Sequence, residues 1–125
     1  YMEAIGHHEF GDGLRPVNFG GWVDEAPEPT CLAFWVQYWS AAYQHVLAHA
    51  DENTVLLSYD RLVDEPRTAL SRLADLISVN PSVLTGQADQ VRPPRSHSVE
   101  AAALSSETRR RAAALHDTLK QRAPV

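Results

Sequence analysis

The residues best placed to do chemistry stand at the end of a short apolar run, 54–59. Ser58, Tyr59 and Asp60 occupy its carboxyl end. If the run is a strand, these side chains lie at the edge where open α/β sheets gather their ligand-binding groups. A tyrosine there could set its ring or hydroxyl against a nucleotide base, or it could pack under the next helix. Position alone leaves both interpretations of Tyr59 open.

A second group of polar side chains surrounds a turn stiffened by Pro93 and Pro94. Two guanidiniums and two hydroxyls in this turn could surround the oxygens of a phosphate, which arginine binds through paired hydrogen bonds. A solvated basic loop is the plainer interpretation of the same residues. The candidate anion site consists of Arg92, Arg95, Ser96 and Ser98.

The histidines and the cysteine give weaker signals. His45 and His49 are four residues apart and could share a helix face as metal ligands do, but the carboxylates Asp51 and Glu52 follow the expected end of that helix. We therefore expect no metal site. Cys31 has no sequence neighbour that marks it as a nucleophile. Neither a Walker loop nor a G-x-G-x-x-G after a strand is present.

Several helices are expected to position these groups. Residues 1–30 are rich in glycine and proline, which predicts a long loop. From Thr30 to about Ala50, apolar residues recur at three- and four-residue steps, which predicts a helix. Further helices are predicted from Asp64-Glu65-Pro66, from Asn80-Pro81 to about Ala88, and after Ser105 or Ser106. The apolar faces expected of the first two helices are Leu32, Trp35, Val36, Trp39, Tyr43, Val46 and Leu47, then Leu70, Leu73, Ala74 and Ile77.

The run 54–59 is apolar on both alternations, which predicts a strand buried on both faces within a parallel sheet. No second run has comparable strand character. Because one strand cannot form a sheet, its neighbours would have to lie upstream of Tyr1 or in another chain. The expected fold class is α/β, with a central parallel sheet and a mostly helical contribution from this chain.

Composition narrows the classes of partner. The chain has 125 residues, 44% hydrophobic, with 11 basic and 16 acidic side chains and a net charge of −5. This acidic balance argues against a nucleic-acid partner or an anionic membrane surface, both of which need a basic excess. No stretch reaches the roughly 18 apolar residues of a membrane span. A single cysteine excludes an intramolecular disulfide and fits a reducing, cytoplasmic location.

Three segments follow one another in an order seen in a known family. They are Phe19-Gly20-Gly21-Trp22, the tryptophan-bearing stretch 34–39, and the stretch 55–66 leading into 70–77. This order resembles the C-terminal half of bacterial-type cytosolic sulfotransferases, in which a strand ends in a Tyr-Glu/Asp-x-Leu motif before an acidic-proline turn. The likeness covers about residues 19–78, with a looser similarity at 92–98.

The resemblance implies transfer of a sulfuryl group from 3′-phosphoadenosine 5′-phosphosulfate to a hydroxyl or amine of a small-molecule acceptor. It also implies a P-loop-like, three-layer fold. The family's strand-end tyrosine lies beside the donor's adenine, and this position is Tyr59. Basic residues of its C-terminal loop hold the 3′-phosphate, and the loop 1–30 could cover the acceptor as a lid. The matching candidates are Arg92, Arg95, Ser96 and Ser98 for the donor, and His7, His8 and Glu9 for the acceptor.

The family's 5′-phosphosulfate loop and catalytic base are not recognisable in this sequence, and we expect them upstream of Tyr1. Residues 1–125 are accordingly interpreted as the C-terminal portion of one domain, with the N-terminal part of that domain as partner. We expect no activity from the 125 residues alone, because those missing groups would supply nearly all of the catalysis.

Two other classes of function fit the pattern of elements. One is a P-loop nucleotide kinase whose Walker loop lies upstream. The other is a non-enzymatic helical interaction module whose strand adds to a partner's sheet edge. The chain could also form a homodimer.

Overall fold

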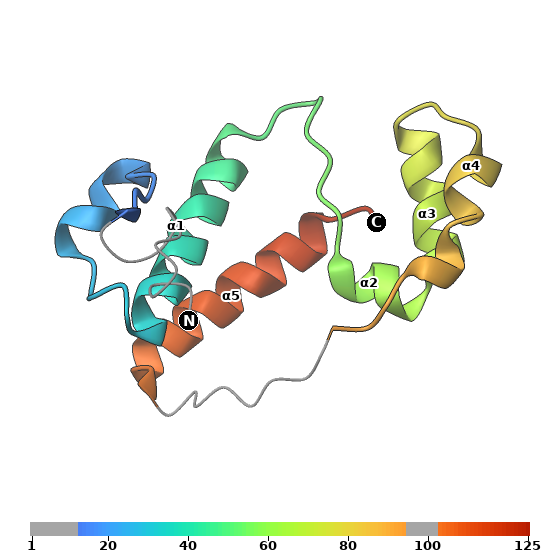
Figure 1. Ribbon diagram of the computed structural model, residues 1–125. Coiled ribbons are helices and arrows are strands. Elements are labelled where there is room, and N and C mark those ends of the chain that lie inside the picture. Colours follow the sequence, from blue (N-terminus) through green and yellow to red (C-terminus); the bar gives the residue numbers. More distant parts are fainter. Residues whose placement is uncertain (1–12, 95–102) are drawn as a thin grey trace. The chain divides into compact units, whose positions relative to one another are not determined.

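The computed structural model describes residues 13–94 and 103–125, and within these ranges it contains helices and turns but no β-strand (Figure 1). The chain divides into two compact units. Unit 1 takes the described residues of Tyr1–His49 and Glu100–Leu115, and unit 2 takes those of Ala50–Val99 and His116–Val125. The last helix, α5 (Ser106–Arg122), contributes to both units.

Unit 1 is built on aromatic packing between a short 3-10 helix, η2 (Phe19–Glu25), and α1 (Leu32–His49). The Trp22 ring stacks on Tyr38 with centroids 5.2 Å apart and an interplanar angle of 14°, and it also contacts Phe34 at 5.2 Å. Phe34 is only 2% exposed. Such aromatic pairs add to the stability gained from burying their area, so this cluster holds η2 against α1.

Two glycines allow η2 to turn sharply enough to bring Trp22 onto α1. Gly20 and Gly21 have φ of +63° and +84°, a left-handed conformation that costs side-chain-bearing residues energy. The Asn18 Oδ1 accepts a hydrogen bond from the Val23 backbone N–H at 3.0 Å and closes the turn. Part of the region predicted to be a loop therefore has regular local structure.

Unit 2 contains α2 (Tyr59–Asp64), α3 (Pro66–Leu76), α4 (Pro81–Thr85) and the 3-10 helix η3 (Ala88–Gln90). Helix α3 packs against its three neighbours, and its small side chains allow close approach. Ala69 and Ala74 on α3 and Ala88 on η3 are 4%, 0% and 3% exposed. The predicted helices from Pro66 and after Ser105 are confirmed, whereas the predicted helix from Pro81 ends at Thr85.

The predicted strand at 54–59, and with it the α/β fold class and its central parallel sheet, is wrong for the described residues. Residues 54–57 have no regular structure, and Tyr59 begins α2 instead. Val55 and Leu57 are 40% and 42% exposed, so the expected burial of both faces is also absent. The physical reason is that a strand needs hydrogen-bonding neighbours, and the described part of the chain supplies none.

The predicted apolar faces are correct only in part. Tyr43 and Val46 of α1 are 39% and 36% exposed, and Ile77, beyond the end of α3, is 50% exposed. Among the described residues, no helix is both long and apolar enough to cross a membrane.

Candidate functional site

Helix α2 places the strongest sequence candidate, Tyr59, at its first position. The Ser58 side chain caps this helix by accepting a hydrogen bond from the Arg61 backbone N–H at 3.4 Å, and Asp60 adds a negative charge to the first turn. Both features stabilise a helix N-terminus. The Ser58 backbone N–H donates to the Val125 carbonyl at 2.6 Å, which ties this end of α2 to the segment after α5.

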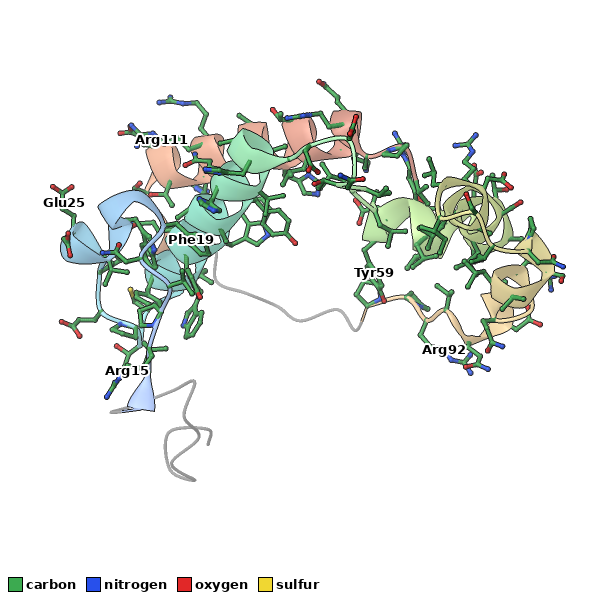
Figure 2. The ribbon with its side chains drawn as sticks, turned by 90° about the horizontal axis from the view of Figure 1, so that it is seen from above. Arg15, Phe19, Glu25, Tyr59, Arg92 and Arg111 are labelled. Carbon is green, nitrogen blue, oxygen red and sulfur yellow. The ribbon has the colours of Figure 1, made fainter. Side chains whose placement is uncertain are left out.

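The structure brings Tyr59 together with one candidate of the basic turn. The Tyr59 hydroxyl donates a hydrogen bond to the Arg92 backbone carbonyl at 2.7 Å, although the residues are 33 positions apart. Tyr59 is 50% exposed, and Arg92 is also exposed. Figure 2 shows the Tyr59 side chain reaching from α2 to the segment that carries Arg92. The bond places a half-exposed tyrosine ring next to the backbone of an exposed arginine, and these two residue types suit a ligand that combines an aromatic base with a phosphate.

Arg92 reaches this position through η3 and the turn that follows it. Ala88 anchors η3 in the core, and the Val91 backbone is extended, with φ of −65° and ψ of 124°. An ion pair between Arg67 and Asp89, with an N–O distance of 3.2 Å, adds a contact between η3 and α3. The side chains of this pair are 68% and 87% exposed, so buried Ala88 rather than the ion pair must fix η3.

Other predicted site residues fall outside the described ranges. These are Arg95, Ser96 and Ser98 of the candidate anion site, and His7, His8 and Glu9 of the candidate acceptor site.

Asp60, the other polar residue next to Tyr59, is engaged by the C-terminal half of α5. Its Oδ2 accepts a hydrogen bond from Lys120 Nζ at 3.1 Å and lies 4.0 Å from His116 Nε2. The side chains of Asp60, His116 and Lys120 are each about half exposed. These contacts join α2 to the end of α5, and because all three side chains are exposed they add little to stability.

Unit 2 also contains a pocket of about 240 Å³ that the sequence did not predict. Its lining combines two guanidiniums, two carboxylates and a hydroxyl over buried apolar side chains. The lining comes from α2, from α3 and from the last residue, so no single local pattern in the sequence signals it. The lining residues are Arg61, Asp64, Glu65, Thr68, Ala69, Arg72 and Val125.

The turn before α2 carries a perturbed carboxyl group. The Thr54 hydroxyl donates to Asp51 Oδ1 at 2.9 Å, and the Asn53 backbone N–H donates to the same oxygen at 3.0 Å. Because these bonds favour the ionised form, chiefly the bond from Thr54, the pKa of Asp51 lies below its ordinary value of 3.8. They fix the chain direction after α1.

Within residues 13–94 and 103–125, no three histidine, cysteine or acidic side chains gather as metal ligands would. Comparisons of the chain with models of protein families, with curated proteins and with solved structures found no match.

Proposed function

We propose that this chain is part of a sulfotransferase that moves a sulfuryl group from 3′-phosphoadenosine 5′-phosphosulfate to a hydroxyl or amine of a small acceptor. In this proposal Tyr59 and Arg92 bind the adenosine part of the donor. The observation that supports it is the hydrogen bond from Tyr59 to Arg92, because it joins two segments that the sequence resemblance assigns to one ligand. The contact requires no sheet.

The two side chains suit the two halves of adenosine 3′,5′-bisphosphate, the product left by the donor. An exposed tyrosine ring can stack on adenine, which contributes about 1 to 3 kcal/mol per base. The Arg92 guanidinium has no ion-pair partner among the described residues, so it is available to a phosphate. We place the reaction in the cytoplasm, where a single cysteine such as Cys31 stays reduced.

Binding of the bisphosphate is the sharpest test, because this sequence has no recognisable 5′-phosphosulfate loop or catalytic base with which to assay transfer of the sulfuryl group. Calorimetric titration of the chain, and of a longer polypeptide containing it, should show binding. Tyr59→Ala should weaken binding about 5- to 150-fold, the equivalent of the stacking energy. Arg92→Gln should also weaken it, because a charge-assisted hydrogen bond is lost.

Tyr43→Ala is the matched control, since Tyr43 is a comparably exposed tyrosine in unit 1, 39% against 50% for Tyr59. It should leave the affinity unchanged. Equal affinity of Tyr59→Ala and wild type would exclude Tyr59 from the site. Failure of both polypeptides to bind would refute the proposal, and tighter binding of ATP than of the bisphosphate would favour a nucleotide kinase.

One observation favours a second candidate, a helical interaction module. Seven of the ten large apolar side chains that are exposed among the described residues belong to unit 2, and exposed apolar side chains that gather on one face mark protein interfaces. If the partner is a second copy, sedimentation velocity should show concentration-dependent association that Val83→Lys abolishes. A monomer at every concentration would exclude the homodimer. The residues concerned are Val55, Leu57, Tyr59, Leu76, Ile77, Val79 and Val83.

A further inference from the structure

The last turn of α1 carries two histidines side by side. His45 and His49 are four residues apart, so they share one face of the helix. Their ring centroids are 4.0 Å apart, with an interplanar angle of 31°. Both residues are exposed, so an ion in solvent can reach both rings. Both belong to unit 1, whereas the residues of the proposed donor site belong to unit 2.

The hydrogen bond made by His49 determines which of its ring nitrogens can bind a metal. His49 Nδ1 lies 2.8 Å from the His45 backbone carbonyl oxygen. Because a carbonyl oxygen only accepts hydrogen bonds, Nδ1 carries the proton, and Nε2 of the neutral ring keeps its lone pair. Metal-binding histidines use this arrangement, in which the second ring N–H donates to a carbonyl or carboxylate and fixes the ring.

The His45 ring is positioned by packing. It contacts the Phe19 ring of η2, with centroids 5.1 Å apart and an interplanar angle of 40°. Two nitrogens bound to one metal at about 2 Å each lie roughly 3 Å apart, and ring centroids 4.0 Å apart are compatible with that spacing. Little side-chain freedom would then be lost on binding.

We propose that His45 and His49 form a surface site for a late first-row divalent cation, with water completing its coordination. Imidazole ligands suit Zn²⁺, Ni²⁺ and Cu²⁺, and Cu²⁺ binds tightest in the Irving–Williams order. A cation here also meets the negative end of the α1 dipole, because α1 ends at His49. This proposal departs from the expectation from sequence, which gave the two histidines little weight as metal ligands because Asp51 and Glu52 follow the end of the helix.

Titration of the untagged chain with ZnCl₂ and CuCl₂ tests the site. Calorimetry should show one zinc equivalent bound, and Cu²⁺ should broaden the NMR signals of the last turn of α1 first. His45→Gln and His49→Gln should each weaken zinc binding more than about tenfold. Removing a group that only hydrogen-bonds to a metal ligand already weakens metal binding about tenfold, and removing the ligand itself should cost more. Glutamine suits an exposed helix position, and circular dichroism should confirm that the variants stay helical.

Two controls separate this site from the other histidines. His116→Gln, at an exposed position of α5, should leave zinc affinity unchanged. The double variant His7→Gln/His8→Gln should bind as wild type does. Absence of zinc and copper binding by wild type would overturn the proposal. Wild-type affinity in His45→Gln and His49→Gln, or loss of binding in a control variant, would also overturn it.

Discussion

Replacing Arg61 with methionine tests how unit 2 holds the segment after α5. The Arg61 guanidinium donates to the Ala123 carbonyl at 2.7 Å and to the Lys120 carbonyl at 3.4 Å. The same segment ends in Val125, which is 1% exposed and whose carbonyl accepts from the Ser58 N–H at 2.6 Å. Methionine keeps the aliphatic stem of arginine and removes all of its donors.

The expected effect follows from the two hydrogen bonds. A bond from a charged donor contributes about 1.5 to 3 kcal/mol, and the short, half-buried bond to Ala123 belongs in this range. The bond to Lys120 is long and exposed, so it adds little. Arg61→Met should therefore favour local opening by about 1.5 to 3 kcal/mol, which is about 10- to 150-fold in the opening equilibrium.

Amide hydrogen exchange measures this opening directly. The Ser58 N–H, bonded to Val125, should exchange about 10- to 150-fold faster in Arg61→Met. Arg67→Met is the matched control, because Arg67 lies on α3 and its exposed ion pair with Asp89 of η3 contributes at most about 1 kcal/mol to stability. If Ser58 exchanges at the wild-type rate in Arg61→Met, or equally fast in both variants, Arg61 does not hold the segment.

Three further predictions concern other parts of the chain. Trp22→Ala should destabilise unit 1 by about 3 kcal/mol, which is the low end of the range for removing a large aromatic side chain, because Trp22 is half-buried. Hydrogen exchange of the Tyr38 amide should report this change, and a loss of stability below about 1 kcal/mol would contradict the packing. Gly20→Ala should cost about 1 to 2 kcal/mol in thermal unfolding because φ is +63°, although an added Cβ meets nothing within 4 Å; a gain in stability would be inconsistent with that φ. Because folding lowers the pKa of Asp51, ionised Asp51 stabilises the folded state above its ordinary pKa of 3.8, and this stabilisation is lost as the pH falls through the lowered pKa of the folded state. An NMR titration of the Asp51 carboxyl with a midpoint at or above 3.8, or a midpoint that Thr54→Val leaves unchanged, would refute this.

The helix starts in the described residues could be predicted because their signals are local. Two such signals are the proline at the first position after Glu65 and the cap residue Asn80 before Pro81. Each starts a helix through its immediate neighbours alone. Ser105 similarly caps α5, accepting from the Thr108 N–H at 3.1 Å. Exact ends were less predictable, because packing decides how far a short helix extends.

The strand could not be predicted correctly from its own residues, because a strand depends on partners elsewhere in the chain. The apolar pattern at 54–59 describes side chains suited to burial, but it does not supply hydrogen bonds. A competing local signal was present. Ser58 followed by Asp60 is a helix N-cap with an acidic first turn, and it begins α2 at Tyr59.

The candidate site shows the same division between local and distant information. Tyr59 and Arg92 could each be chosen from sequence, yet their hydrogen bond depends on how α3, α4 and η3 fold between them. The pocket at Arg61 and Arg72 escaped prediction because its lining comes from two helices and from Val125. No local pattern specifies that combination.

The aromatic packing of unit 1 gives the molecule a built-in optical reporter. All three tryptophans, Trp22, Trp35 and Trp39, lie in unit 1, and unit 2 has none. Fluorescence excited selectively in the indole rings therefore reports on unit 1 and not on unit 2. If adenosine 3′,5′-bisphosphate binds at Tyr59 and Arg92, any change in tryptophan emission would reveal energetic coupling between the units, and constant emission would mean that unit 1 does not sense the ligand.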